Sequence, residues 1–218
     1  MANESKLNVG HQEFWDKHFE HIGPETIKKL IPEYCSQAMK KLSSYGCKRV
    51  LELGSGGGRF SIMLAKNGFS MKAIDFSKNA IKVLNDLATL EGVKVDTEVS
   101  SAQNFDPDSE PFDAIICWFI LDHMPLHETA RIVNNFKKNL SPGKGVLLVS
   151  FDGPSDDICS DRFEVLPDGT RCYIKGDFKG LLWRYTSDQE IYKLFQDFEQ
   201  LEFEKAECGS RIVWLKAR

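Results

Sequence analysis

Residues 50–60 read VLELGSGGGRF, an apolar run followed by glycines at positions 54, 56 and 58 and then by a second hydrophobic stretch. Glycine inside an element costs backbone entropy, so a cluster of glycines implies positive φ angles or a close approach to the backbone. A strand that passes through such a turn into a helix offers bare backbone and free N–H groups to a ligand. This stretch therefore predicts a small-molecule site at a strand-to-helix turn.

Strands and helices alternate on both sides of this turn. The hydrophobic pattern predicts strands at 49–53, 71–74, 94–99, 112–119 and 145–151, and helices at 60–66, 78–87 and 127–139. The run FDAIICWF at 112–119 is apolar enough to be buried on both faces, as parallel strands are. The alternation predicts an open, mostly parallel sheet that is covered by helices on both faces.

The segments that flank this core follow other patterns. Pro24 begins a helical pattern that continues to Leu42 and that Pro32 divides. Residues 152–185 are polar, rich in turns and too short for a domain, so we interpret them as an insertion over the active face. Within them, RFEVLPDGTRCYI predicts a hairpin that turns at its Asp-Gly pair, residues 168–169.

The C-terminal region predicts one helix and two strands. The sequence SDQE at 187–190 matches a capping box for a helix that runs through Phe198. Residues 201–206 and 211–217 are strand candidates on either side of a turn near 209–210. We expect these two strands to pair antiparallel at an edge of the sheet.

Composition excludes several classes of protein. A chain of 218 residues that is 42% hydrophobic suits one domain with a core, and its formal net charge of −4 argues against general nucleic-acid binding. No apolar run is long enough to span a bilayer, and the N-terminus lacks the pattern of a secretory signal. The six cysteines are dispersed without zinc-site spacing, so we expect reduced thiols, no metal site and a cytoplasmic protein.

A carboxylate strengthens the prediction of a ligand site. Asp75 ends the second predicted strand, about 20 residues beyond the glycine turn, where an acidic side chain can accept both hydrogen bonds from a ribose diol. The glycine spacing is GxGxG rather than the GxGxxG of dinucleotide-binding turns, and the lysine of a P-loop is missing. The pair of features favours a ligand that carries a ribose, and the alternatives are a turn that needs flexibility and an aspartate that starts a helix.

Four motifs in order make residues 50–149 resemble the class I S-adenosylmethionine-dependent methyltransferases. They are ELGSGGG, AIDFSKNAI, FDAIICWFILDHM and LSPGKGVLLV, and YTSDQEIYKLF further resembles the helix entry before the last two strands in small-molecule members. The resemblance implies a Rossmann-like doubly wound, mostly parallel seven-stranded sheet with an antiparallel last strand. It implies S-adenosyl-L-methionine as cofactor and S-adenosyl-L-homocysteine as product.

The resemblance also implies which residues contact the cofactor. Those expected beside its methionine part and sulfonium are Glu52, Gly54, Ser55, Gly56, Gly58, Cys117 and Trp118. Those expected beside its ribose and adenine are Asp75, Phe76, Ser101, Ala102 and Gln103. Because Ser101 stands where the family often has an acid, we expect a weaker adenine contact there or one made by Gln103.

Other residues are candidates for the acceptor side. His123 is the candidate general base, although relatives often carry histidine there without acid–base duty. FWDKHF, residues 14–19, is expected before the first helix as a lid segment, where Trp15 either closes over the cofactor or packs on the sheet. His11, His18 and His21 lack zinc spacing and are expected at the surface. The insertion offers candidate pocket residues, which are Phe163, Tyr173, Trp183, Arg184 and Tyr185.

We therefore predict an enzyme that moves a methyl group to a small-molecule acceptor by in-line displacement, as a monomer or homodimer that binds neither nucleic acid nor membrane. We divide its single domain into a helical lid segment (1–45), a cofactor-binding core (46–151), the insertion (152–185) and the last helix and strands (186–218). Two alternatives stay open. One is a catalytically silent cofactor-binding partner subunit, and the other is a nucleotide-dependent oxidoreductase.

Overall fold

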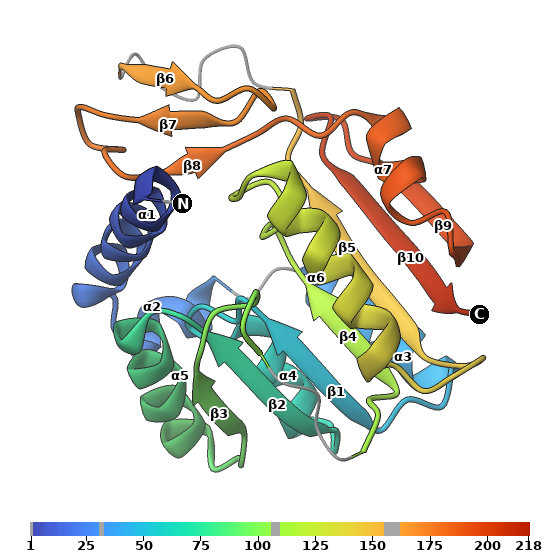
Figure 1. Ribbon diagram of the computed structural model, residues 1–218. Coiled ribbons are helices and arrows are strands. Elements are labelled where there is room, and N and C mark those ends of the chain that lie inside the picture. The colour runs from blue at the N-terminus through green and yellow to red at the C-terminus, as the bar shows by residue number, and fades with distance from the viewer. Residues whose placement is uncertain (1, 31–32, 106–109, 155–161) are drawn as a thin grey trace.

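The computed structural model of the chain describes residues 2–30, 33–105, 110–154 and 162–218. Its centre is a seven-stranded sheet in the order β3-β2-β1-β4-β5-β10-β9 (Figure 1). The strands are β1 (Arg49–Leu53), β2 (Ser70–Asp75), β3 (Asp96–Val99), β4 (Ala114–Cys117), β5 (Val146–Phe151), β9 (Phe198–Lys205) and β10 (Arg211–Ala217). The first five strands are mutually parallel, and the last strand, β10, is antiparallel to both of its neighbours. The predicted sheet, including the antiparallel last strand, is confirmed.

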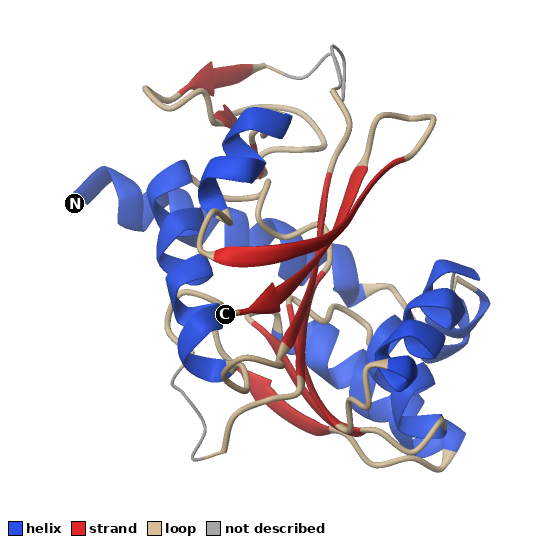
Figure 2. Cartoon of the chain, turned by 90° about the vertical axis from the view of Figure 1, so that its right-hand side faces the viewer, coloured by secondary structure: helices blue, strands red, loops and turns tan. Residues whose placement is uncertain are grey.

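Helices cover both faces of this sheet, as predicted (Figure 2). One face packs against α3 (Glu33–Ser44), α4 (Arg59–Lys66) and α5 (Lys78–Glu91), and the other against α6 (Leu126–Asn139) and α7 (Asp188–Leu194). Strand β4 is buried on both faces, since Ala114 and Ile116 join one core cluster and Ile115 and Cys117 join the other. Among the described residues, no helix is both long enough and apolar enough to cross a membrane.

Several element boundaries differ from the sequence-based prediction. Strand β4 ends at Cys117 rather than at Phe119, because the backbone of Phe119 turns to a positive φ of 53°. Helix α5 continues past Leu87 to Glu91 and ends at Gly92, which adopts the left-handed conformation. Helix α7 ends at Leu194, so that Phe198 begins β9 instead of ending the helix. Its predicted capping box is present at Ser187.

The N-terminal helix α1 (Ala2–Glu20) was not predicted, and it corrects the placement of FWDKHF, which lies inside this helix rather than before the first helix. A tertiary contact holds it. Asp16 accepts hydrogen bonds from Ser77 Oγ (2.7 Å) and from the Asn79 N–H (3.0 Å), both at the start of α5. Helix α2 (Pro24–Lys29) follows, and α3 begins at Glu33. The helical pattern predicted from Pro24 to Leu42 is thus two helices, and Pro32, which was expected to divide it, lies outside the described residues.

The insertion forms a small antiparallel sheet beside α1 (Figure 1). Strands β6 (Phe163–Val165), β7 (Arg171–Tyr173) and β8 (Leu182–Trp183) pair in that order, with the predicted hairpin between the first two. Tyr173 and Trp183 are buried in an apolar cluster that Phe14 and Trp15 of α1 join. Tyr173 and Trp183 therefore attach the insertion to α1 instead of lining a pocket.

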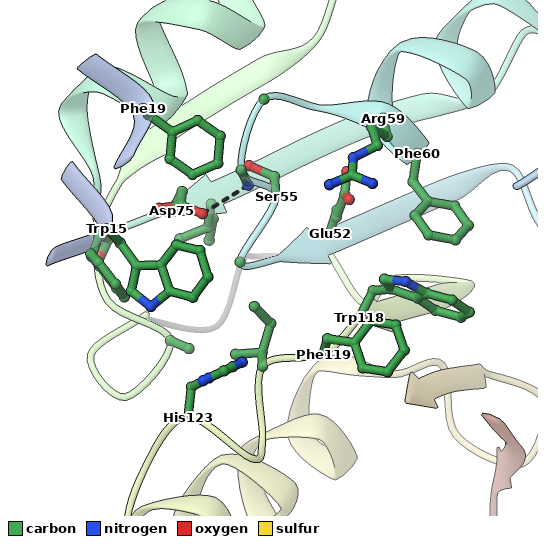
Figure 3. Close-up of a pocket in the computed structure, with 18 of the residues that line it drawn as sticks. Trp15, Phe19, Glu52, Ser55, Arg59, Phe60, Asp75, Trp118, Phe119 and His123 are labelled. Carbon is green, nitrogen blue, oxygen red and sulfur yellow. Dashed lines mark hydrogen bonds between the residues drawn. The ribbon is translucent and has the colours of Figure 1, made fainter. Parts of the chain in front are cut away.

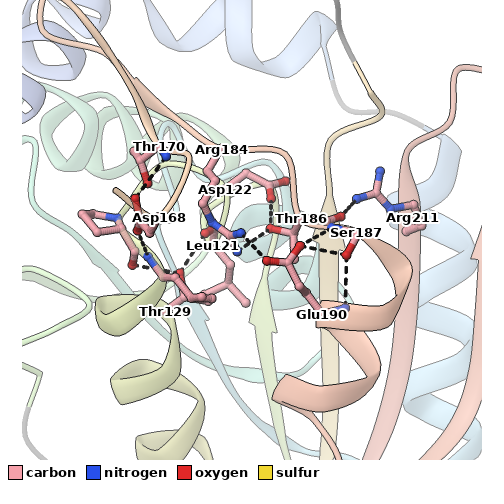
Figure 4. A network of polar contacts seen from close by, with 12 residues as sticks. Leu121, Asp122, Thr129, Asp168, Thr170, Arg184, Thr186, Ser187, Glu190 and Arg211 are labelled. Carbon is pink, nitrogen blue, oxygen red and sulfur yellow. Dashed lines mark hydrogen bonds and ion pairs between the residues drawn. The ribbon is translucent and has the colours of Figure 1, made fainter. Parts of the chain in front are cut away.

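A buried polar network joins the insertion to the main sheet (Figure 4). Asp122, which follows β4, accepts hydrogen bonds from Thr186 Oγ1 (2.7 Å) and from the Asp152 N–H, and its own carbonyl accepts from the Arg184 N–H (2.8 Å). Arg211 of β10 is fully buried and donates to the Thr186 and Asp152 carbonyls. One arginine thus satisfies backbone groups on both sides of the insertion.

Arg211→Leu is expected to lower the free energy of unfolding by roughly 3–5 kcal/mol, because it leaves buried carbonyls and the nearby Asp188 carboxylate without their cation. Urea unfolding followed by circular dichroism measures the change. Arg218→Leu, at an exposed position just after the same strand, is the matched control and is expected to change stability by less than about 0.5 kcal/mol. Equal effects in both variants would contradict this role of Arg211.

Candidate functional site

The glycine turn lies between β1 and α4 and is attached to the end of β2 by hydrogen bonds. The Gly54 and Ser55 N–H groups both donate to the Ile74 carbonyl (2.8 and 3.1 Å), and the Gly56 N–H donates to Asp75 Oδ2 (2.8 Å). Gly54 and Gly56 have φ values of 66° and 50°. A Cβ at Gly54 would overlap the Ile120 side chain, and one at Gly56 would lie 3.0 Å from Phe19 Cζ. Glycine is required here by both backbone conformation and close packing.

A cavity of about 470 Å³ opens beside this turn, at the carboxyl ends of β1, β2 and β4 (Figure 3). The sheet order reverses between β1 and β4, which is where open α/β sheets bind ligands. Helix α1 lies over the cavity and contributes His11, Trp15 and Phe19 to its wall. The volume falls within the range of small-molecule sites.

Most of the predicted site residues line this cavity. They are Trp15, Glu52, Gly54, Ser55, Gly56, Asp75, Phe76, Ala102, Gln103, Trp118 and His123. Sequence reasoning missed other lining residues, among which are His11, Phe19, Tyr34, Arg59, Phe119 and Ile120.

Three predicted residues do not line the cavity. Gly58 is the N-cap of α4 and faces α5, since a Cβ there would lie 2.6 Å from Leu84 Cγ. Cys117 is fully buried in the core beneath the sheet. Ser101 is not part of the lining, although Ser100 before it and Ala102 after it are.

Glu52 lies under the turn and is 3% exposed. Its Oε2 accepts hydrogen bonds from the Ser61 N–H (2.9 Å) and from Ser61 Oγ. Burial raises the pKa of Glu52 to about 7, against the opposing effect of the Ser61 hydrogen bonds. The side chain therefore supports the first turn of α4 and borders the cavity at the same time.

Asp75 holds the turn from the other side. Its Oδ1 accepts from the Ser77 N–H and its Oδ2 from the Gly56 N–H, each at 2.8 Å. Burial raises the pKa of Asp75, and these two backbone hydrogen bonds act in the opposite direction. Each carboxylate oxygen can accept more than one hydrogen bond, so Asp75 keeps acceptor capacity for a ligand.

Two histidines of the cavity wall, His11 and His123, lie together beside β8. Their rings stack with centroids 6.1 Å apart. The Leu182 N–H donates to His11 Nδ1 (3.2 Å), and His123 Nδ1 lies 3.0 Å from the Leu182 carbonyl. Since a carbonyl only accepts, Nδ1 of His123 carries the proton, and Nε2 of the neutral ring is a free base. The backbone of one residue in the insertion thus orients both rings.

Burial determines the charge of these rings. It lowers the pKa of His11 to about 3 and also lowers the pKa of His123, although Asp152 Oδ2, 3.9 Å from His123 Nε2, favours the protonated form. The prediction that His11 lies at the surface is wrong, because it is 8% exposed. His18 and His21 are exposed, as expected. A signal for His11 was available, since residues 11, 15 and 19 share one face of a helix.

The side chains of the insertion that were expected in an acceptor pocket lie outside the cavity lining. Phe163, Tyr173, Trp183, Arg184 and Tyr185 do not line the cavity, and Arg184 instead pairs with Glu190 at 2.7 Å. Within the described ranges no group of three or more histidine, cysteine or acidic side chains could hold a metal ion.

Comparison with known proteins agrees with this geometry. Residues 50–143 match the model of a methyltransferase domain. The chain is 35% identical over 139 residues to a ubiquinone biosynthesis O-methyltransferase of Xylella fastidiosa. The aligned region covers 63% of this chain and 53% of that protein. Residues 50–143 are thus similar to a methyltransferase domain, and the chain has the fold of a solved S-adenosylmethionine-dependent methyltransferase.

The chain has further relatives. A protein of the same name from Alkalilimnicola ehrlichii is 30% identical over 139 residues, which cover 59% of this chain and 53% of that protein. The chain thus spans about half the length of these curated relatives. A methyltransferase structure from Clostridium acetobutylicum covers 92% of this chain and 98% of its own, with a TM-score of 0.71 at 13% identity. Magnesium protoporphyrin IX methyltransferase from Synechocystis, solved with bound S-adenosylmethionine, gives a TM-score of 0.62 at 16% identity and covers 85% and 79%.

The residues of the cavity suit S-adenosylmethionine. Ser55 lines the cavity, and its Oγ is buried and has no hydrogen-bond partner among the described residues. A buried hydroxyl of this kind calls for a ligand or water as its partner. The positive-φ turn, the Asp75 carboxylate and the aromatic wall offer groups of the kinds that an amino acid, a ribose and an adenine need.

Glu52→Gln is expected to change how stability depends on pH. Because the folded-state pKa of Glu52, about 7, lies above its ordinary value of 4.5, the folded protein keeps a proton that the unfolded chain releases. Stability therefore falls as pH rises from about 4.5 to 7, by up to roughly 3 kcal/mol, and the variant lacks this component. Urea unfolding at several pH values measures the difference, with the exposed Glu25→Gln as control. Parallel curves for wild type and Glu52→Gln would contradict the effect.

Proposed function

We propose that the chain transfers the methyl group of S-adenosylmethionine to a small-molecule acceptor and releases S-adenosylhomocysteine. The observation that carries this proposal is the cavity at the β1–β4 switch point, where the glycine turn, Asp75 and the chain after β4 border one space. The activity of the domain relatives supports the same reaction. When bound, the cofactor supplies an electrophilic methyl group on a sulfonium.

Each part of the cofactor has candidate residues in the cavity. Asp75 would accept hydrogen bonds from the ribose hydroxyls, and Phe76 would lie against the adenine. Ser55 would donate to the methionine part through the hydroxyl that lacks a partner within the described chain, and Glu52 would orient the ammonium. Charged hydrogen bonds of this kind are stronger than neutral ones.

The acceptor would enter on the side of α1 and the insertion. His123 borders the cavity there with Nε2 free to accept a proton, and the Asp152 carboxylate beside it would stabilise the imidazolium that forms. A base is useful when the acceptor loses a proton during attack, as a hydroxyl does. We therefore propose an oxygen acceptor, in agreement with the O-methyltransferase name of the relatives.

Helix α1 and the insertion would exclude water from the reacting atoms. Trp15 and Phe19 line the cavity beside Asp75 and Ser55 (Figure 3). Alignment of the acceptor in line with the methyl group, in a space without water, can supply most of the acceleration that such a transfer needs. We thus retain residues 1–45 as a lid segment and 46–151 as the cofactor-binding core.

The location and assembly of the protein are further parts of this proposal. Four described cysteines are buried and unpaired, and Cys208 is exposed and free, as in reducing compartments. Cys159 lies outside the described residues. We propose a cytoplasmic enzyme, monomeric or homodimeric, and sedimentation equilibrium separates the two states.

Asp75→Asn is expected to weaken binding of S-adenosylmethionine about 10- to 100-fold, because hydrogen bonds to a charged acceptor are lost or become neutral. Isothermal titration calorimetry measures the dissociation constant. Asp86→Asn, on the exposed side of α5, is the matched control and is expected to bind like wild type. NADH is titrated in parallel, and binding of NADH without binding of S-adenosylmethionine would favour an oxidoreductase instead.

His123→Gln is expected to lower methyl transfer about 10²- to 10⁴-fold, while the affinity for S-adenosylmethionine changes little, because the variant loses the base and keeps the cavity. Methyl-labelled S-adenosylmethionine with panels of phenols, amines and thiols measures the transfer. His21→Gln, at an exposed position, controls for loss of an imidazole. Cofactor binding by wild type without transfer to any acceptor in these panels would favour the silent partner subunit.

A further inference from the structure

One residue of the cavity wall has a strained backbone. Among the described residues, Phe119 is the one non-glycine residue with a positive φ, and its value of 53° lies in the left-handed region. Side chains with a Cβ seldom adopt this conformation, and bulky ones least of all. Such strain persists where the surrounding structure over-determines it, and it is concentrated at functional sites.

A hydrogen bond from the next strand holds this conformation. The Phe119 N–H donates to Ser150 Oγ at 2.8 Å, and Ser150 is fully buried in β5. Strand β5 pairs with β4, so the two residues lie side by side at the carboxyl end of the sheet. The Trp118 ring meets the Phe119 ring edge to face at 5.2 Å. The hydroxyl of Ser150 thus fixes the turn at which the chain leaves β4.

The turn places residues 118–120 across the cavity from the glycine turn. Strands β1 and β4 are parallel with Leu53 opposite Cys117, so the residues that follow each strand face one another. The Ile120 side chain fills the space where a Cβ of Gly54 would lie. Figure 3 shows Phe119 and Trp118 on the wall opposite Ser55.

This wall faces the place where a positive charge would lie. If the amino-acid part of the cofactor rests on the glycine turn and the ribose on Asp75, the sulfonium that joins them lies between, next to residues 118–120. In this arrangement the two carboxylates in the described cavity lining, Glu52 and Asp75, are taken by the ammonium and the ribose. Aromatic rings are therefore the surface available to that cation, and they attract cations through their quadrupole.

We propose that Phe119 is a specificity-determining residue whose ring, held by Ser150, favours the cationic sulfonium of S-adenosylmethionine over the neutral thioether of S-adenosylhomocysteine. Ser150 is the positioning residue in this arrangement. The inference rests on the proposed function and adds to it a means of releasing the product in preference to the cofactor.

Calorimetric titration of the full chain with S-adenosylmethionine and with S-adenosylhomocysteine tests the proposal. Phe119→Leu is expected to weaken binding of the cation about 5-fold or more, while affinity for the neutral product changes less than about 2-fold. Phe119→Tyr keeps a ring and is expected to keep the wild-type ratio. Equal weakening of both ligands by Phe119→Leu, or no weakening of either, would overturn the proposal.

A second pair of variants tests the strain. Phe119→Ala and Phe119→Gly both remove the ring, but only alanine keeps a Cβ at the positive φ, so the glycine variant is expected to unfold at the higher temperature. The opposite order would show that the left-handed conformation is not adopted in solution, and the proposal would fail.

The role of Ser150 has its own readout. Ser150→Ala is expected to lower the ratio of the two affinities as Phe119→Leu does, and Ser150→Thr, which keeps the hydroxyl, to retain it. An unchanged ratio in Ser150→Ala would remove Ser150 from the proposal. Wild-type protein that binds neither ligand would contradict the proposed function itself, a result distinct from equal weakening of both ligands.

Discussion

The attachment of the glycine turn to the end of β2 is the interaction on which the rest of the site depends. Two turn N–H groups share the Ile74 carbonyl, and a third donates to Asp75. Backbone donors buried at this edge must be satisfied, and the neighbouring strand does so. The same bonds set the turn beside the carboxylate that would hold a ribose, so that fold and ligand site are stabilised together.

The described part of the insertion contacts two residues of the cavity wall. The backbone of Leu182 orients His11 and His123, while the polar network around Asp122 and Arg211 anchors the insertion to the sheet. Burial lowers the pKa of both imidazoles and so favours their neutral forms. In His123 this leaves Nε2 without a proton and able to act as a base. Elements that contribute little to the central core thus orient two histidines of the cavity wall.

A strained backbone and a shifted pKa occur at the ends of two neighbouring parallel strands, β4 and β1. Phe119 keeps a left-handed backbone, and Glu52 keeps a raised pKa, in a fold that is otherwise regular. Neither feature strengthens the core. Both lie in the wall of one cavity, which is where a protein that binds and transforms a ligand is expected to depart from its most stable arrangement.

The sequence by itself determined the order of strands and helices, the glycine turn and the acid at Asp75, because these depend on local periodicity and on spacings within one β-α-β unit. It did not determine helix α1, the burial of His11 or the turn at Phe119. His11 accepts a hydrogen bond from Leu182, which is 171 positions away in the sequence. Phe119 donates a hydrogen bond to the hydroxyl of Ser150 in another strand. Contacts between distant segments decide such features, and only the tertiary structure brings those segments together.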